Sequence, residues 1–229
     1  MKKLSRRYTY NSSKIKKPLY KLEEALKLLK ETATAKFQET VELHASLNIN
    51  PKYPNQQLRA TVTLPYGTGN KIKIAALVPE SEIQNAEKAG AELTNSSQLI
   101  IDINKGLINF DVLITTPEMM PKLAKLGRIL GPKGLMPSPK SGTVTNNIEE
   151  TILDFKKGKF EYKADKTGVV HIPFGKAKFN ESELIQNAFT LYKSILNNRP
   201  LGVKGKYFKN IFICSSMGPS IKVDLASFE

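Results

Sequence analysis

The side chains that most often carry catalysis or bind metals are scarce in this chain. Its 229 residues include one cysteine, Cys214, and two histidines, His44 and His171. One cysteine excludes an internal disulfide, and these three residues cannot assemble the usual zinc ligand sets. No acid or base stands at a recognisable spacing from either histidine, so each is expected to form a hydrogen bond within a sheet or to a partner. Cys214 lies in the apolar run IFICSS and is expected to be buried and inert.

One segment, LPYGTGNK at residues 64–71, places two glycines near a lysine and hints at phosphate binding. The full phosphate-loop spacing GxxxxGK[ST] and the dinucleotide pattern GxGxxG are absent from it. Pro65, Gly67 and Gly69 are better explained by a hinge or a crossing between domains. The sequence therefore predicts no catalytic residue, no metal and no cofactor. An enzyme that uses the middle of the chain for a nucleotide is a competing hypothesis, but it would need a phosphate loop and a general base.

Charge indicates the class of partner. The chain has a formal net charge of +14 and an isoelectric point near 9.7. Residues 1–67 carry +8, residues 68–159 carry +2 and residues 160–229 carry +4, so the two ends hold +12. This surplus favours a polyanionic partner, either nucleic acid or an anionic membrane surface. Charge that serves solubility alone is the alternative.

The amino-terminal segment leaves two interpretations open. Residues 1–17 contain seven basic residues, no acid, and two tyrosines, Tyr8 and Tyr10. They form either a disordered arm that settles on phosphates or a merely soluble tail. The segment has no apolar core of the kind a secretory signal needs, so it is interpreted as a mature end. No apolar run reaches the roughly eighteen residues of a membrane span, and the lone cysteine favours a reducing compartment.

Periodicity predicts the elements that would position a binding surface. Residues 36–49, KFQETVELHASLNI, alternate apolar and polar side chains, which predicts a strand with one buried face. Residues 58–64 repeat the alternation after the connection NPKYPNQ, and the two strands are expected to pair antiparallel. Their shared polar face would then present the side chains of Thr40, Glu42, His44, Arg59, Thr61 and Thr63.

Two helices and further strands are predicted for the chain ends. A helix after Pro18 has an apolar stripe at helical spacing, and a second helix begins with Asn180 and Glu183 in capping positions. Strands are expected at residues 168–176 and within 209–225, bent around residues 217–219. The ends would together form helices on an antiparallel-type sheet. The predicted core stripes are Leu19, Leu22, Ala25, Leu26 and Leu29, and Leu184, Ala188, Leu191 and Ile195.

The middle of the chain has a different sequence pattern. Apolar strands at residues 72–78, 91–93 and 110–116 alternate with helices, which predicts an α/β layer with a largely parallel sheet. The first of these helices is expected to begin at a Ser81–Gln84 capping pattern and to end at Gly90. The others are expected to begin near Ser96, at Pro117 and within NNIEETILDFKKG. The run at 127–144, GRILGPKGLMPSPKSGTV, is predicted to be a shaped loop. Its Arg128, Lys133 and Lys140 favour an interaction surface slightly over a soluble turn.

The fold class predicted is therefore α/β in two domains. A discontinuous domain of residues 1–67 and 160–229 would pack helices on its sheet, and residues 68–159 would be inserted between its halves. Termini that meet in one domain readily permit such an insertion.

Five segments carry a resemblance to a known family: TVELHASLNI, LPYGTGNKIKI, GRILGPKGLMPSPKSGTV, DKTGVVHIPFGK and SSMGPSIKV. In this order and spacing the chain closely resembles the large-subunit ribosomal protein family called L-one, of the bacterial and plastid type. The resemblance runs from about residue 20 over essentially the whole chain, and the 127–144 segment is highly specific.

The resemblance implies a first domain made of both chain ends, with a second, Rossmann-like three-layer domain inserted. It implies a structural, non-catalytic protein that binds large-subunit ribosomal RNA and contacts other ribosomal components. This protein would form a mobile stalk near the tRNA exit site and assist release of deacylated tRNA. A translational repressor that binds its own messenger RNA with the same surface is the alternative. The expected location is a bacterial cytoplasmic ribosome or a plastid ribosome, with no membrane partner.

The family's RNA surface lies on the first domain, and its residues are carried over one by one. Where the family usually has Thr-Thr before Met-Gly, this chain has Ser215 and Ser216, each of which keeps the hydroxyl and loses a methyl. Tyr66 stands where histidine is common and Asn70 where lysine is. The residues implied to bind RNA are Lys36, Phe37, Thr40, Glu42, His44, Asp165, Lys166, Thr167, His171, Ser215, Ser216, Met217, Gly218 and Ser220.

Elementary chemistry agrees with this placement. Structured RNA is recognised through shape, 2′-hydroxyls and phosphates, for which short hydroxyl side chains and a close-approaching glycine are suited. Phe37 could stack on a base or ribose, or it could be a core aromatic. Met217 is expected to fill a shallow RNA-facing depression.

Overall fold

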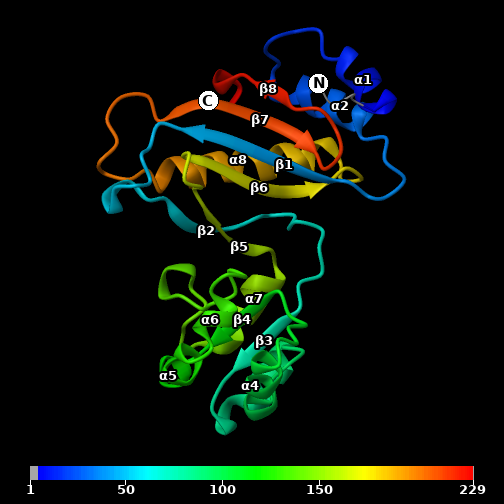
Figure 1. Ribbon diagram of the computed structural model, residues 1–229. Helices are drawn as coiled ribbons and strands as arrows, with labels where there is room; N and C mark the ends of the chain where they lie inside the picture. The colour runs from blue at the N-terminus through cyan, green and yellow to red at the C-terminus, as the bar shows by residue number, and fades with distance from the viewer. Residues whose placement is uncertain (1–4, 229) are drawn as a thin grey trace. The chain divides into compact units, whose positions relative to one another are not determined.

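The computed structural model describes residues 5–228 and divides the chain into two compact units (Figure 1). One unit, here the terminal unit, contains both ends of the chain, up to Gly69 and from Glu161. The other, here the middle unit, is Asn70–Phe160. The mixed α/β class expected from the sequence is confirmed, since helices accompany both antiparallel and parallel strands.

The terminal unit contains three α-helices and most of the strands of the described chain. Its elements are α1 (Arg6–Ser13), α2 (Leu22–Thr32), β1 (Thr40–Leu47), η1 (Pro54–Gln56), β2 (Arg59–Thr63), β5 (Lys159–Lys163, which enters from the middle unit), β6 (Val169–Lys176), α8 (Glu181–Asn197), β7 (Phe208–Ser215), β8 (Ile221–Val223) and η5 (Leu225–Phe228).

Strand β1 lies inside a four-stranded sheet of order β6-β1-β7-β8. Both of its neighbours run antiparallel to it and come from the far end of the chain. The expected pairing of β1 with residues 58–64 is wrong, because β2 pairs with β5 in a separate two-stranded sheet. The η1 turn and its flanking residues carry the chain away from β1, so Arg59, Thr61 and Thr63 lie on a different sheet from Thr40, Glu42 and His44.

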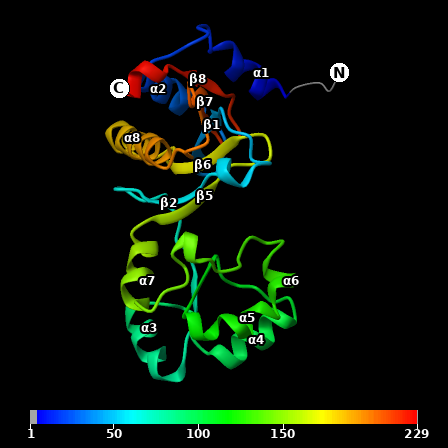
Figure 2. The same cartoon turned by 90° about the vertical axis from the view of Figure 1, so that its left-hand side faces the viewer.

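Helices α2 and α8 cover one face of this sheet (Figure 2). The alternation in β1 is confirmed: Val41, Leu43, Ala45 and Leu47 are buried, and the residues between them are half-buried. The α8 stripe of four apolar residues is fully buried, and the Glu183 carboxylate accepts the Asn180 amide at 2.9 Å, as the capping pattern predicted. Leu19 is the exception among the predicted core residues, since it precedes α2 and is 41% exposed.

The amino-terminal segment is not a disordered arm where the structure describes it. Residues 6–13 form α1, which begins after Ser5, whose hydroxyl accepts the Tyr8 amide at 3.3 Å. The Asn11 side chain is buried and donates a hydrogen bond to the Thr32 carbonyl at the end of α2, at 2.8 Å. Residues 1–4 lie outside the described residues.

The middle unit alternates strands and helices along the chain. Its elements are β3 (Ile74–Leu77), η2 (Glu80–Glu82), α3 (Ile83–Ala89), α4 (Ser96–Asn104), β4 (Val112–Thr115), η3 (Pro117–Met119), α5 (Met120–Ala124), α6 (Gly127–Leu130), η4 (Pro139–Ser141) and α7 (Ile148–Lys156).

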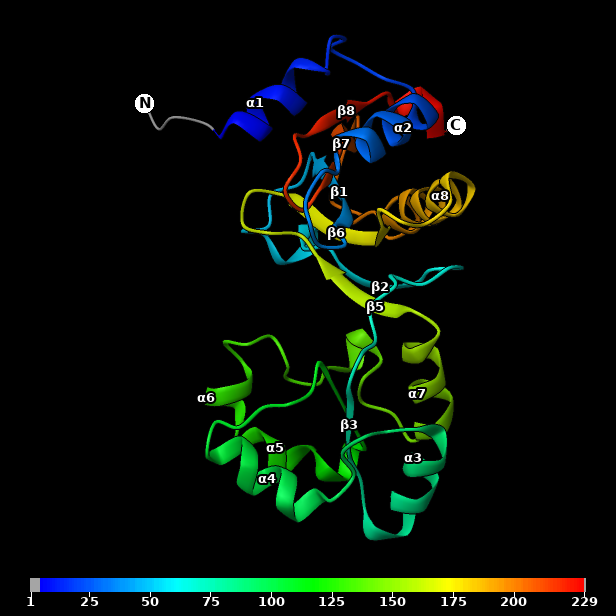
Figure 3. The same ribbon diagram turned by 90° about the vertical axis from the view of Figure 1, so that its right-hand side faces the viewer.

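Strands β3 and β4 pair in parallel, as the alternation predicted. Helices α3 and α7 lie on one side of β3, and α4, α5 and α6 on the other (Figure 3). Alternate strand residues enter separate apolar clusters: Ala75 and Leu77 join the α4 side, whereas Ile74 and Ala76 join the α3 side. Both faces of this sheet are therefore buried. Among the described residues, no helix is both long and apolar enough to cross a membrane.

Three local expectations in the middle unit need correction. The segment at 91–93 forms only an isolated parallel bridge between Leu93 and Ala75, not a strand. Ser81 does not cap a helix, because η2 precedes α3 and no side chain caps α3. The loop at 127–144 contains one turn of helix, α6, and the short η4. The predicted Gly90 stop is confirmed by its positive φ of 95°.

Candidate nucleic-acid interface

The sheet face opposite α2 and α8 carries the polar residues of β1. Thr40, Glu42 and His44 project to this face, here called the open face, and each is half-buried by its neighbours. They do so because side chains alternate along a strand and the apolar positions between them are packed under the helices. In β7, Cys214 pairs with Glu42, and in β6, His171 pairs with His44. Antiparallel register thus brings together residues that are far apart in sequence.

One end of the open face is bordered by two loops that are joined to each other. Residues 36–39 lead into β1, and residues 216–220, here the β7–β8 loop, follow β7. The Thr40 amide donates to the Ser216 hydroxyl at 3.1 Å, and the Ser216 amide donates to the Thr40 carbonyl at 3.0 Å. Lys36, Ser216 and Ser220 are exposed. The sequence-predicted residues of these two loops are therefore brought together.

A buried carboxylate anchors both loops, and sequence reasoning missed it. Glu39 is 2% exposed, and its two oxygens accept the amides of Ala35 at 2.8 Å and Met217 at 3.0 Å. Burial alone would raise the pKa of Glu39, but the Ser215 hydroxyl and those two amides outweigh it and lower the pKa. Glu39 continues the alternation of β1, since it is buried two residues before Val41, but its carboxylate does not fit the apolar pattern that marks a buried face.

Two large apolar side chains are exposed where these loops meet solvent. Phe37 is 56% exposed and Met217 is 51% exposed. The interpretation of Phe37 as a core aromatic is therefore wrong, and the side chain is available for stacking. Ser215 differs from its neighbours because it is 2% exposed, beneath the surface beside Glu39. A Cβ on Gly218 would collide with the Ser215 hydroxyl, so a larger residue here would have to displace that buried hydroxyl.

Asp165 and Thr167 shape a turn before β6. The Asp165 carboxylate accepts the Val169 amide at 2.8 Å, the Thr167 amide at 2.9 Å and the Thr167 hydroxyl at 2.7 Å. The Val169 amide and the Thr167 hydroxyl are the main groups that hold the pKa of Asp165 below its usual range. These bonds occupy both side chains and leave Lys166 exposed between them. Lys166 is thus the residue of this trio free to meet a phosphate.

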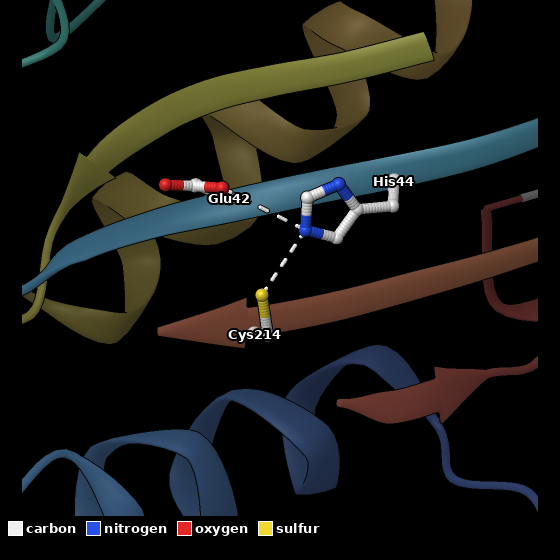
Figure 4. Close-up of side chains that lie close together, drawn as sticks. All are labelled: Glu42, His44 and Cys214. Atoms are coloured by element: carbon white, nitrogen blue, oxygen red, sulfur yellow. Dashed lines mark hydrogen bonds and ion pairs between the residues drawn. The ribbon is translucent and has the colours of Figure 1, made fainter. Parts of the chain in front are cut away.

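The two histidines meet across β1 and β6. The Nδ1 atoms of His44 and His171 are 2.8 Å apart, and the rings stand edge to face with centroids 4.9 Å apart. His44 Nε2 lies 3.0 Å from Cys214 Sγ and 3.7 Å from a Glu42 oxygen (Figure 4). Burial and the neighbouring His171 lower the pKa of His44, although Glu42 opposes them. Burial, helped by Glu42, raises the pKa of Cys214 to about 11.

Two further basic features of the terminal unit were missed by sequence reasoning. The Lys176 ammonium donates to the Thr40 hydroxyl at 2.8 Å, which adds a cation beside the predicted residues. A hollow of about 310 Å³ is lined by Arg59, Lys163 and Lys166 among others, with Arg59 paired to Glu161. Register between distant strands, which the sequence does not reveal, creates both features.

The arrangement can bind but offers little for catalysis. Its exposed groups are hydroxyls, amides, lysines, the His171 imidazole, the hydrogen-bonded Asp165 carboxylate and two apolar side chains, and its thiol is protonated at neutral pH. Such a set provides hydrogen bonds to ribose and phosphate, counter-charge and stacking surfaces, which are the means by which folded RNA is recognised. Tyr66 is 45% exposed, and Asn70 lies in the middle unit, outside this surface.

Almost all residues of this surface lie in the part of the chain that matches a known protein family. A family model described as "Ribosomal protein L1p/L10e family" matches residues 29–219, which contain every expected RNA-binding residue except Ser220. The "Large ribosomal subunit protein uL1c" of Trieres chinensis is 62% identical over 229 residues, covering 100% of both chains. The protein of the same name from Phaeodactylum tricornutum is 58% identical over the same span. The "Large ribosomal subunit protein uL1" of Prochlorococcus marinus (strain MIT 9515) is 53% identical, covering 100% of this chain and 97% of its own. On the strength of these matches, the chain belongs to the ribosomal protein L1p/L10e family.

Proposed function

We propose that this chain is a structural protein of the large ribosomal subunit that binds large-subunit ribosomal RNA through its terminal unit. The observation that carries the proposal is the open face of the four-stranded sheet, bordered by exposed Phe37 and Met217. Both chain ends, which build this unit, hold +12 of the net charge of +14. The names of the family and of its relatives support the same assignment.

Each group on the surface has a distinct task in this proposal. Lys36 and Lys166 neutralise phosphates, and the Ser216 and Thr40 hydroxyls hydrogen-bond ribose or phosphate oxygens. Phe37 and Met217 supply apolar surface for a base or ribose, which contributes on the order of 1–3 kcal/mol per stacked base. Glu39, Asp165 and Thr167 position these groups through the hydrogen bonds described above.

The finer assignments belong to the same proposal. The RNA-binding domain comprises residues 1–67 and 160–229, and residues 68–159 form an inserted Rossmann-like domain. The protein forms a mobile stalk near the tRNA exit site and assists release of deacylated tRNA. It works in a plastid or bacterial ribosome, which the names uL1c and uL1 of its relatives support.

A messenger RNA is the alternative partner. A surface that recognises the shape and backbone of RNA would accept any RNA with the same fold. If the protein's own messenger RNA has that fold, binding to it would repress translation. Expression of the native operon with and without excess protein separates the two roles. Unchanged expression would exclude repression and leave ribosomal RNA binding intact.

The test of the main proposal is binding of the full chain to a large-subunit ribosomal RNA stalk fragment over a range of salt concentrations. We expect specific, salt-resistant binding and a clear preference over a scrambled RNA of equal length, because hydrogen bonds and stacking add to the phosphate contacts. The matched control replaces Arg128, Lys133 and Lys140 of the middle unit with alanine and should keep the affinity. Binding that vanishes with salt for every RNA, or that is lost in this control, would overturn the proposal.

A further inference from the structure

Three potential metal ligands of different chemistry meet on the open face. A carboxylate oxygen of Glu42, a ring nitrogen of His44 and the sulfur of Cys214 all lie within 4.8 Å of one another (Figure 4). One cysteine and two histidines alone do not make a usual zinc ligand set. The fold places the Glu42 carboxylate beside His44 and Cys214 and so adds a third ligand type.

The backbone fixes these three side chains relative to one another. Glu42 and His44 are two residues apart in β1 and therefore share a face. Cys214 is directly opposite Glu42 on β7, the strand beside β1. Strand β1 has a hydrogen-bonded neighbour on both edges, and β7 pairs with β1 on one edge and with β8 up to Ile213 on the other, so the site rests on strands rather than on loops.

A chain of polar contacts orients the His44 ring. The Asp165 carboxylate lies 3.8 Å from His171 Nε2, which favours a proton on that nitrogen. The Nδ1 atoms of His44 and His171 are 2.8 Å apart, so one ring donates to the other. In the tautomer in which His44 Nδ1 donates, the lone pair of His44 Nε2 is directed at Cys214 Sγ, 3.0 Å away. A histidine that ligates a metal is held in the same way, with its other ring nitrogen donating to a partner.

We propose that Glu42, His44 and Cys214 bind one divalent transition-metal ion, with Zn²⁺ as the best match. Zinc accepts nitrogen, oxygen and sulfur ligands together, whereas calcium and magnesium require oxygen ligands. Zinc bonds of about 2.0–2.3 Å in a tetrahedron place neighbouring ligand atoms about 3.3–3.6 Å apart. The spacings of 3.0 Å for nitrogen to sulfur and 3.7 Å for nitrogen to oxygen lie close to that range. Water occupies the fourth position.

Metal binding changes the charge of the site. The Cys214 thiol loses its proton to solvent as sulfur bonds to zinc, so one proton is released per ion bound. Glu42 and the neutral thiol together carry −1, and the zinc complex with Glu42 and thiolate carries 0. The ion therefore removes a negative charge from the open face.

The experiment titrates Co²⁺, the spectroscopic substitute for zinc, into the untagged, metal-stripped full chain without RNA. We expect one ion per monomer, a thiolate-to-cobalt charge-transfer band, visible bands of tetrahedral intensity, and release of one proton. Zn²⁺ should abolish the bands by displacement. The chain has a single cysteine, so a thiolate band identifies Cys214 as the ligand. No thiolate band at saturating Co²⁺, or a band that requires two chains per ion, would overturn the proposal.

Variants separate a metal site from a hydrogen-bond network. Cys214→Ser should abolish the band, and Glu42→Gln and His44→Gln should each weaken Co²⁺ binding at least tenfold. His171→Ala, which removes the positioning partner, should keep the band and weaken binding roughly 10- to 100-fold. Ser46→Ala, on the same face of β1, is the matched control and should bind Co²⁺ normally. Thermal unfolding of each metal-free variant verifies that it folds, and unchanged Co²⁺ affinity in a folded Glu42→Gln or His44→Gln variant would contradict the proposal.

Discussion

The two units use their sheets in opposite ways. In the terminal unit, β1 alternates buried and half-buried residues, so only one face of its sheet is covered by helices. In the middle unit, β3 is buried at all four positions, Ile74 to Leu77, because apolar clusters occupy both faces. The difference shows that a sheet covered on both faces is committed to the core, whereas a sheet covered on one face retains a surface for a partner.

The test with the largest expected effect on stability places a carboxylate on each sheet. Ala76→Asp should destabilise the middle unit by roughly 3–5 kcal/mol, because it leaves an unpaired charge in a fully buried position. Ser46→Asp, on the open face, should cost less than about 1 kcal/mol, as expected for surface substitutions. Urea unfolding followed by circular dichroism measures the loss, and hydrogen exchange locates it. Equal losses would mean that the open face is packed like a core.

The second test concerns RNA affinity. Met217→Asp should weaken binding of the ribosomal RNA fragment about 10- to 100-fold, equivalent to roughly 1.4–2.8 kcal/mol. The change removes an exposed apolar contact and adds a negative charge where phosphates would approach. Leu153→Asp, on α7 of the middle unit and 46% exposed, adds the same charge to the other unit. If both variants bound RNA equally well, Met217 would not belong to the interface.

Salt dependence provides a smaller and more specific effect. Lys36→Ala should lower affinity modestly and reduce the slope of log affinity against log salt by about one, because one phosphate contact is lost. Lys27→Ala, an exposed position on the helix that covers the opposite face, should leave the slope unchanged. Fluorescence anisotropy at several salt concentrations measures both slopes. A slope that Lys36→Ala does not alter would mean that Lys36 contacts no phosphate.

The smallest expected effect is on stability as a function of pH. The folded-state pKa of His44 is lowered below its ordinary 6.5, so the unfolded chain binds this proton more readily. The contribution of neutral His44 to stability is fully present above pH 6.5 and is lost as pH falls from 6.5 through the lower pKa of the folded state. His44→Gln should flatten the dependence between pH 7 and pH 5, by less than about 1 kcal/mol for a half-buried group. Urea unfolding at the two pH values would contradict this if wild type and variant changed equally.

Local patterns predicted much of the fold because their causes are local. The alternation of β1 and the stripe of α8 report which side chains face a core, and both are confirmed. The predicted partner of β1 was wrong, because β1 pairs with strands more than a hundred residues further along the chain. The sequence shows only that residues 58–64 form the next strand. Helix α1 was missed because its basic composition resembles a disordered arm, and the buried Asn11 that fixes it has a distant partner.

The candidate interface was predictable only in part. Resemblance to a family indicated residues 36–44 and 215–220, which the structure joins through Glu39 and Ser216. It could not reveal that Ser215 is buried, or that Asp165 and Thr167 bind each other. Nor could it bring His171 and Cys214 to His44, because only strand register does so.

The order of the sheet has a consequence for synthesis of the protein. The Thr40 amide bonds to a hydroxyl 176 residues further along the chain, on Ser216. A growing polypeptide thus acquires all of Asn70–Phe160, with its own core, before β1 gains either neighbour. Domains fold as units as they emerge, so the middle unit matures first while β1 waits with unpaired edges. An abandoned, unfinished chain therefore has no assembled open face.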